Sequence, residues 1–170
     1  VLNKADGPFT ATDEQRLKAF SAQAAIAIEN AQLFEDVMNM KNYNESILRS
    51  MSNGVITIDD SDCIVTANDA ALSILKLGQQ PSGFFGRQVS EYFVGDNSWV
   101  AESLERVKIS KKPDLAMDVD IWLGEKPPSE SEERDKASIN LTCVPLLDVK
   151  DEPLGSMLLI EDITKEKRLK

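Results

Sequence analysis

The feature that most constrains the fold is a long stretch without helix-breaking residues. From Asp13 to about Met51 the chain contains no Pro or Gly, and Ala, Glu, Gln, Leu and Lys dominate its first half. These residues favour helix, so the stretch predicts a nearly continuous helix of roughly 58 Å at about 1.5 Å per residue. Thr12, followed by Asp13 and Glu14, is typical of a capping box and predicts that the helix begins there.

The predicted helix carries two overlapping apolar stripes. The first consists of Leu17, Phe20, Ala24, Ala27, Ala31, Phe34 and Met38. The second consists of Ile26, Asn30, Leu33, Val37, Met40, Asn44, Ile47 and Met51. Steps of three and four residues are typical of a coiled coil, in which the two Asn residues would fix the register of parallel helices.

Two apolar faces indicate two contacts, one against a domain and one against a second subunit. We expect a parallel homodimer held by the leading helices. Its seam is predicted to include Ala24, Ala27, Ala31, Val37, Ile47 and Met51. Beyond Asn42 the alternative stays open that one face packs on the domain that follows in the same chain.

Composition narrows the classes of function. The 170 residues suit one medium domain with an appendage. A net charge of −10 repels nucleic acid and anionic lipid, so we expect neither a nucleic-acid nor a membrane partner. The chain has no His, which removes the usual general base, the commonest zinc ligand and the ordinary proximal ligand of haem. The sequence shows no membrane-length apolar run and no secretory signal, and we expect a cytoplasmic protein.

Beyond Ser52 the pattern changes to a strand period, and five short strands are predicted. They cover Val55–Ile58, Cys63–Ala67, Leu115–Leu123, Ala137–Leu147 and Leu154–Thr164. Asn68 and Asp69 offer caps for a short helix that ends near Gly78, and a further helix is predicted over Trp99–Ser110. This order indicates an α+β fold, with a five-stranded antiparallel sheet covered by helices on one face.

The third predicted strand alternates between two faces. Its apolar positions are Leu115, Met117, Val119, Ile121 and Leu123. Asp118 and Asp120 point the other way, so one side is predicted to be buried and the other wet. We therefore interpret the two carboxylates as solvated rather than catalytic. The charged stretch Gly124–Asp135 that follows is predicted to be a solvated loop.

Candidate chemistry within these residues is sparse. The sequence offers no nucleophile with a base, no metal cluster and no phosphate loop, so we expect no catalytic site, no metal and no cofactor. Cys63 and Cys143 are interpreted as packed, reduced thiols. A flavin is disfavoured because the central helical region contains no Cys. An aromatic cluster there is a candidate ligand pocket, although core packing is the favoured interpretation: Phe84, Phe85, Tyr92, Phe93 and Trp99.

Two separated stretches, SNGVITIDDSDCIVTANDAALSIL and SMLLIEDITKEKR, resemble the two ends of a PAS domain. The resemblance covers about residues 44–167 and places the domain at 52–164, with the start of an output linker helix at 165–170. It implies that Asn68 caps the first helix after the leading hairpin. It also implies that Asp162, Ile163 and Thr164 connect the final strand to an output helix.

The opening residues resemble a second family. The order and spacing of Asn3, Lys4, Phe9, Asp13 and Glu14 are similar to a signature of GAF domains. The resemblance implies an ion pair between Lys4 and Asp13. It indicates that residues 1–38 are the strand end and exit helix of a GAF domain, that 39–51 are a helical connector, and that the chain is a piece of a larger protein. A complete small protein is the alternative.

The combination of GAF and PAS features resembles the regulatory region of a cyanobacterial adenylate cyclase, an enzyme that makes cAMP from ATP. EDITKEKRLK resembles the lead-in to its catalytic domain. The expected function is a dimeric module that transmits a signal from an upstream GAF domain to this output domain. The alternative is a PAS ligand sensor that serves a histidine kinase, a diguanylate cyclase or a phosphodiesterase.

Overall fold

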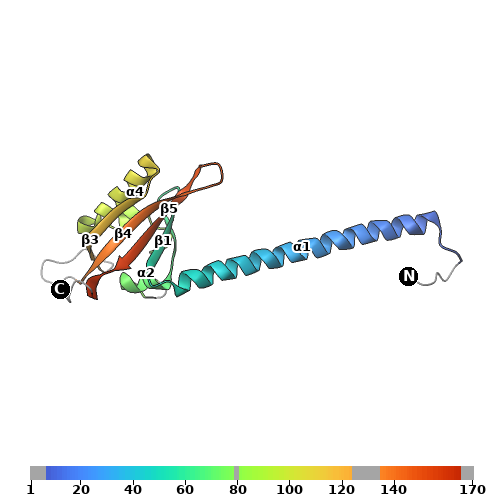
Figure 1. The fold of residues 1–170 in the computed structure, drawn as a ribbon, viewed down its shortest axis with the longest axis horizontal. Coiled ribbons are helices and arrows are strands. Elements are labelled where there is room, and N and C mark those ends of the chain that lie inside the picture. The colour runs from blue at the N-terminus through green and yellow to red at the C-terminus, as the bar shows by residue number, and fades with distance from the viewer. Residues whose placement is uncertain (1–6, 79–80, 124–134, 166–170) are drawn as a thin grey trace. The chain divides into compact units, whose positions relative to one another are not determined.

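The computed structural model describes residues 7–78, 81–123 and 135–165 of the chain (Figure 1). The chain divides into two compact units, Val1–Ser46 and Ile47–Lys170. The helices are α1 (Ala11–Ser50), α2 (Asp69–Ile74), α3 (Val89–Tyr92), the 3-10 turn η1 (Gly95–Asn97) and α4 (Trp99–Ser110). The strands are β1 (Gly54–Asp59), β2 (Ile64–Ala67), β3 (Asp114–Trp122), β4 (Lys136–Leu147) and β5 (Pro153–Asp162).

The long helix is confirmed, but its predicted cap at Thr12 is wrong. α1 begins at Ala11, and Thr10 and Asp13 form a reciprocal box. The Asp13 carboxylate accepts from the Thr10 backbone N–H at 2.9 Å and from its hydroxyl at 2.8 Å. The Asp13 N–H donates to Thr10 Oγ1 at 3.4 Å. Thr12 begins an equally spaced box with Gln15, but a carboxylate accepts more strongly than an amide, so the earlier pair sets the start.

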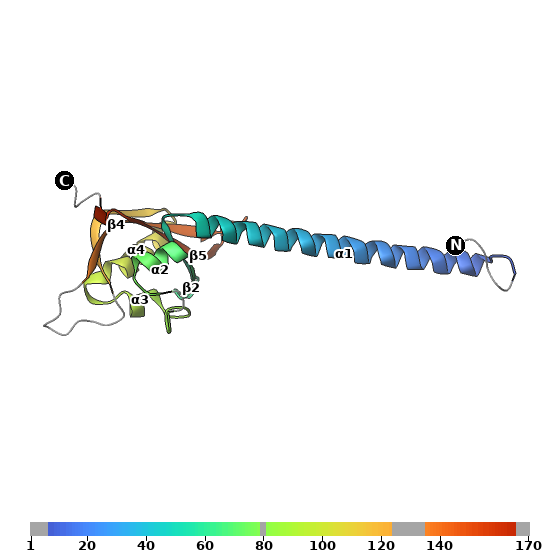
Figure 2. The same cartoon turned by 90° about the horizontal axis from the view of Figure 1, so that it is seen from below.

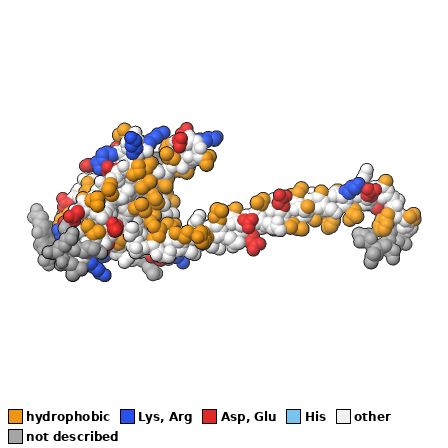
Figure 3. All heavy atoms as spheres, viewed as in Figure 1, with side chains coloured by type: hydrophobic (Ala, Val, Ile, Leu, Met, Phe, Trp, Pro, Cys, Tyr) orange, Lys and Arg blue, Asp and Glu red, His pale blue; other side chains and the backbone are white. Residues whose placement is uncertain are grey.

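The apolar side chains of α1 are exposed. Within this helix, which the structure describes in full, no residue is buried. The exposed large side chains are Leu17, Phe20, Ile26, Ile28, Leu33, Phe34, Val37, Met38, Met40, Tyr43 and Ile47. Figure 3 shows hydrophobic atoms recurring along the visible face of α1. Both stripes are therefore available for contact with a partner.

The sheet has the strand order β2-β1-β5-β4-β3, and its neighbouring strands are antiparallel. Gly54, the first residue of β1, pairs with Ile160 near the end of β5, and Asp162 pairs with Ile139 of β4. The beginning of the sheet and its last residues therefore lie at the same end of adjacent strands.

The core lies between the sheet and the helices. α2, α3 and α4 cover one face (Figure 2). Alternate residues of the three central strands point towards these helices, as a strand period of two requires. The fully buried residues among them include Ile56, Ile58, Ile139, Leu141, Cys143, Leu158 and Ile160. They pack with Ala71 and Leu72 of α2 and with Val100, Leu104 and Val107 of α4. The predicted α+β architecture is confirmed.

Several element boundaries differ from the prediction, among them the end of β5 at Asp162 instead of Thr164, and two of the differences have a clear local cause. β2 begins at Ile64, because Cys63 instead forms an isolated bridge with Gln88. α2 ends at Ile74, well before Gly78, because Lys76 adopts a left-handed conformation with φ of 56°. The Lys76 N–H donates to Ser73 O and the Leu77 N–H donates to Leu72 O, which is the pattern of a Schellman cap.

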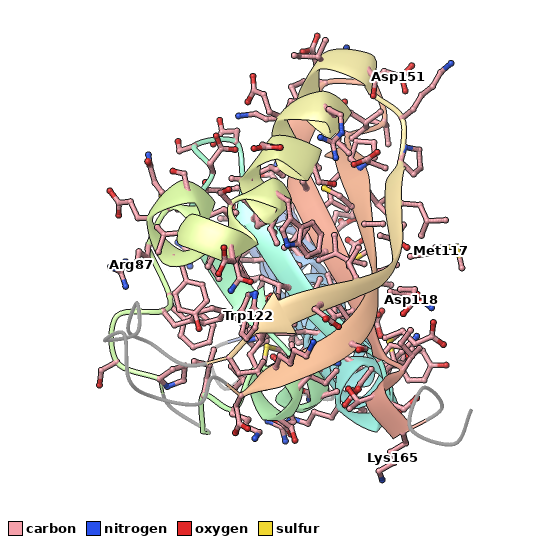
Figure 4. All side chains as sticks on the ribbon, turned by 90° about the vertical axis from the view of Figure 1, so that its left-hand side faces the viewer. Arg87, Met117, Asp118, Trp122, Asp151 and Lys165 are labelled. Atoms are coloured by element: carbon pink, nitrogen blue, oxygen red, sulfur yellow. The ribbon has the colours of Figure 1, made fainter. Side chains whose placement is uncertain are left out.

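The predicted faces of β3 are wrong in its first half. Leu115 is 58% exposed and Met117 is 64% exposed, although alternation predicts that both are buried. The register shifts between Ala116 and Val119, and Asp118 has φ of 53°. This bulge inserts residues that have no opposite partner, so the alternation restarts beyond it. Met117 and Asp118 lie on the outer side of β3 in Figure 4.

Gly54 provides a test of how closely β1 approaches α2. A Cβ atom at this position would lie 2.9 Å from Ala71 Cα and 3.2 Å from Ala71 Cβ. We expect Gly54→Ala to lower the free energy of unfolding by about 1–3 kcal/mol, because the backbone of α2 must move. Urea unfolding measures the change, with the exposed Ser52→Ala as control. Equal stability of the two variants would contradict the close approach.

Candidate functional site

The first candidate region is the N-terminal junction, which we define as the hydrogen bonds of the Asn68 side chain. Asn68 is buried and precedes α2. Its Oδ1 accepts from the N–H groups of Val55 at 2.8 Å and Ala71 at 2.9 Å. Its Nδ2 donates to the carbonyl oxygens of Leu48 at 2.9 Å and Asn53 at 3.0 Å. One amide thus joins the last turn of α1, the connecting loop, β1 and α2.

The Asn68 side chain uses its full hydrogen-bonding capacity at this junction. A side-chain amide has two donor hydrogens and two acceptor lone pairs, and Asn68 uses all four. The backbone N–H of Asn68 also donates to Val55 O at 3.0 Å. The resemblance implied the cap of α2, and the hydrogen bond to Ala71 places Asn68 in that position. The bonds to Leu48 and Asn53 had no signal in the sequence.

The second candidate region is the C-terminal junction, at the end of β5. The Thr164 N–H donates to Asp162 Oδ1 at 2.9 Å. The Ile163 N–H donates to the carbonyl of Ser138 at 2.9 Å. The Ser138 N–H donates to Thr164 Oγ1 at 3.0 Å, and this hydroxyl lies 3.4 Å from Ser138 O. The three residues that resemblance implied for signalling therefore fold back onto β4 at Ser138.

The hydrogen bonds continue from this junction to β3. The Ser138 hydroxyl donates to Asp120 Oδ1 at 2.7 Å, and Lys136 Nζ lies 2.6 Å from Asp120 Oδ2. Asp120 is thus half-buried and bound rather than solvated, contrary to the expectation. Asp118 is exposed, and its backbone N–H donates to Asn140 Oδ1 at 2.9 Å. The Asp120 carboxylate thus binds Ser138 and Lys136, whereas Asp118 binds Asn140 through its backbone.

The aromatic cluster expected as a pocket or core lies partly in the core. Phe84 and Phe93 are buried, Tyr92 and Trp99 are half-buried, and Phe85 is 44% exposed. The rings of Phe84 and Tyr92 meet edge to face with centroids 4.8 Å apart. Phe84 contacts Phe85 and Tyr92 contacts Phe93 with the same geometry. Edge-to-face packing of this kind stabilises a core.

A cavity of about 180 Å³ lies elsewhere, at the opposite end of β1 and β5 from the junctions. Its lining consists of Asp59, Asp60, Val107, Lys108, Lys111, Pro145, Leu147, Pro153, Gly155 and Ser156. None of the aromatic residues contributes to it. Nearby, Lys108 Nζ binds both carboxylate oxygens of Asp62 at 2.8 Å and so ties α4 to the turn between β1 and β2.

Neither Cys has the character of a reactive thiol. Burial raises the pKa of Cys143 to about 12, with a further contribution from the Asp114 charge. The pKa of Cys63 is also raised, first by desolvation and then by the charges of Asp59, Glu91 and Asp62. A high pKa keeps both groups protonated at neutral pH, so they are poor nucleophiles.

A charged contact between α4 and β3 had no signal in the sequence. Asp114 Oδ2 accepts from the Ser103 hydroxyl at 2.6 Å and from Arg106 Nη2 at 2.7 Å. These hydrogen bonds lower the pKa of Asp114, with the Arg106 bond as the largest cause. Ser103 is fully buried, so its hydroxyl depends on this carboxylate.

The GAF-like residues are only partly described. Asn3 and Lys4 lie outside the described residues, and so does the expected ion pair of Lys4 with Asp13. Phe9 is 54% exposed, and Glu14 binds Lys18 within α1 at 2.7 Å. The GAF resemblance therefore stays a prediction.

Among residues 7–78, 81–123 and 135–165, no group of three or more Cys, Asp or Glu side chains is placed to hold a metal ion. In the same part of the chain, no helix combines the length and the apolar character that crossing a membrane requires.

Residues 42–163 match a family model described as the PAS fold. This match covers more than half of the chain, so the chain belongs to the PAS family. The family comprises signal-sensing modules without catalytic activity of their own. No curated protein matches the chain in sequence.

Solved structures agree in fold. The PAS domain of a protein from Colwellia psychrerythraea is 16% identical with a TM-score of 0.55, and the match covers 74% of this chain and 98% of that chain. The E. coli DhaR(N)–DhaL complex is 18% identical with a TM-score of 0.54, covering 91% and 46%. The histidine kinase ThkA in complex with the response regulator TrrA is 20% identical with a TM-score of 0.52, covering 73% and 32%. This chain thus spans less than half the length of the last two.

Asn68→Asp tests the N-terminal junction. The substitution keeps an acceptor for Val55 and Ala71 but turns a carboxylate oxygen towards two carbonyls. We expect the free energy of unfolding to fall by about 1–3 kcal/mol, and amide exchange over residues 47–53 to become faster. Urea unfolding measures the change in stability, and hydrogen exchange followed by mass spectrometry measures the exchange over residues 47–53. Asn97→Asp is the matched control, because the Asn97 side chain binds the backbone of Trp122 instead. Unchanged exchange over 47–53 in Asn68→Asp would contradict the proposed tie.

Asp114→Asn tests the contact between α4 and β3. Because the folded protein lowers the pKa of Asp114, its ionised form stabilises the fold above the ordinary pKa of 3.8. This contribution is lost as pH falls through the lower, folded pKa. We expect the free energy of unfolding of the variant to be about 1–2 kcal/mol lower than that of the original chain at neutral pH, and the difference to be smaller in acid. Urea unfolding over a pH series measures the difference, and a difference that is constant with pH would argue against the assignment.

Proposed function

We propose that the chain is a dimeric, cytoplasmic signal-transmitting PAS module that couples an upstream GAF domain to a downstream output domain. The output domain we favour is an adenylate cyclase, which makes cAMP from ATP. The PAS assignment rests on the family match, and the upstream and downstream partners rest on the two sequence resemblances.

The observation that best supports transmission is the position of the two junctions. The N-terminal junction binds Leu48 of α1 and Val55 of β1. The C-terminal junction follows β5, whose Ile160 pairs with Gly54 of β1. A displacement of the last turn of α1 would reach the end of β5 through one pair of hydrogen-bonded strands. Packed elements with two arrangements are the means by which proteins usually transmit such changes.

The alternative function is ligand sensing by the PAS domain itself. The cavity between α4 and the hairpin of β4 and β5 is the observation that favours it. It is small compared with the usual range of roughly 300–1,000 Å³ for ligand pockets. The two functions therefore differ in where the signal arises, either upstream of α1 or within the sheet domain.

Native mass spectrometry of the purified chain separates the two functions. A dimer without added mass would support transmission and direct the search for the signal upstream. An added mass that is lost on denaturation would support a ligand sensor. A bare monomer over a range of concentrations would contradict the dimeric module.

Asp162→Ala tests the output end in the full-length protein. The variant removes the acceptor for the Thr164 N–H but no core contact. We expect unchanged stability to within about 1 kcal/mol, with loss of the response of the output activity to its upstream signal. Basal and stimulated cyclase activity are the measurements, and Glu105→Ala, at an exposed position of α4, is the control. Normal regulation in Asp162→Ala would exclude a role for this junction in output.

A further inference from the structure

The two stripes along α1 present different apolar side chains to a partner. The second stripe, which we call the Ile26–Met51 stripe, ends at Met51, one residue beyond α1, and has large side chains at six of its eight positions. Their exposed fractions are 54% for Ile26, 56% for Leu33, 65% for Val37, 67% for Met40, 43% for Ile47 and 37% for Met51. The first stripe has large exposed side chains at four of its seven positions, Leu17, Phe20, Phe34 and Met38, and Ala at the other three. Burial of either stripe would stabilise a helix pair, so the polar and charged residues decide between them.

The polar members of this stripe specify orientation. In heptad terms Asn30 and Asn44 are a positions, together with Val37 and Met51, and the d positions are Ile26, Leu33, Met40 and Ile47. In a parallel pair each a position faces its own copy, so the Asn amides bind one another. In an antiparallel pair each Asn would face one of the apolar d residues, and its amide would be buried without a partner.

Charges beside the stripe agree with the parallel arrangement. Asp36 occupies a g position and Lys41 the following e position. In a parallel, in-register pair, the residue at each g position faces the residue at the next e position of the partner helix. Asp36 of each copy therefore faces Lys41 of the other, which gives two ion pairs per dimer. Within its own helix Lys41 Nζ lies 3.8 Å from Glu45 Oε1, a long contact between two exposed side chains. The positions that flank the first stripe offer no pair of opposite charges.

We propose that a second copy of this chain docks on the Ile26–Met51 stripe of α1, parallel and in register, with Asn30 and Asn44 paired at the seam and Asp36 bound to Lys41 across it. This inference rests on the dimer of the proposed function and specifies its interface. It also selects among the seam residues expected from the sequence. Val37, Ile47 and Met51 belong to the seam, and the three Ala residues do not.

The geometry leaves part of the first stripe free for a different contact. The two stripes are offset by one residue, which is about 100° around a helix of 3.6 residues per turn. Over Ile26–Met38, where they overlap, a partner helix centred on one stripe reaches only the near edge of the other. Phe34 shares the e position with Lys41 and lies beside the seam, whereas Leu17 and Phe20 precede the Ile26–Met51 stripe and stay available for another contact.

A charge exchange tests the seam in the intact chain. Asp36→Lys places two like-charged pairs across the interface, and we expect the dimer dissociation constant to rise roughly tenfold. Lys41→Asp should have a similar effect. The double variant Asp36→Lys/Lys41→Asp restores both pairs and should return to within about threefold of the original. Sedimentation equilibrium measures the constants, and circular dichroism checks the helix content of each variant.

Glu35→Lys is the matched control, because Glu35 lies on the far side of the Ile26–Met51 stripe but beside the first one. We expect it to leave the dissociation constant unchanged. A rise for Glu35→Lys together with no effect of Asp36→Lys would overturn the assignment and place the seam on the first stripe. The dimeric function would survive that result. A chain that is monomeric at all concentrations would overturn both.

Oxidative crosslinking gives an independent test. In a Cys63→Ser background, Val37→Cys should form a disulfide between the two copies, and Ala31→Cys should not. Cys143 is buried with a pKa of about 12 and does not compete. Crosslinking of Ala31→Cys alone would overturn the proposed seam. Failure of both variants in a chain that sediments as a dimer would also overturn it, because the dimer would then use another surface.

Discussion

The buried side-chain amide of Asn68 is the contact on which the beginning of the PAS domain depends. Four backbone groups from four segments converge on it, each through a direct hydrogen bond. A buried donor or acceptor that loses its partner costs more than a hydrogen bond normally contributes, so the four segments hold one another in place. The cap of α2, the start of β1 and the end of α1 are therefore fixed together. Because Gly54 pairs with Ile160, the same amide also sets where β1 meets β5.

The C-terminal junction differs in character from the N-terminal one. Its hydrogen bonds use backbone groups, the Thr164 hydroxyl and the Asp162 carboxylate; Asp162 is exposed and Thr164 is half-buried, although Ser138 is buried. Contacts to exposed side chains open at lower energetic cost than those of a buried amide. In the transmission that we propose, a displacement of α1 would move the tightly bound start of β1 with it and would meet the weaker set of bonds only after β5. This difference favours movement at the output end over movement of the sheet.

Sequence patterns predicted the features that depend on local or periodic signals. The range of α4, the cap at Asn68 and the order of strands and helices all follow from capping residues and hydrophobic period. The bulge of β3 was missed because Asn140, which binds the Asp118 N–H, comes from a strand far along the chain. The Schellman cap was missed because Lys76, not the expected Gly, adopts the left-handed conformation. The bonds from Asn68 to Leu48 and Asn53 were also missed because the partners are distant in sequence. The pattern that predicts a helix cap does not indicate what else the same amide binds.

The exposure of the apolar side chains of α1 supports the dimeric function that we propose. α1 has 40 residues, and none is buried. Most helical stability in proteins comes from packing of an apolar face, so a helix without such packing is stabilised only by its caps, its propensities and pairs such as Glu14 with Lys18. A second copy on the Ile26–Met51 stripe would supply the missing packing up to Met51, next to the carbonyls that Asn68 holds. Pairing of the helices and order at the N-terminal junction would then stabilise each other. A signal that altered the pairing of the helices would first change the hydrogen bonds of Asn68, at the start of the sheet.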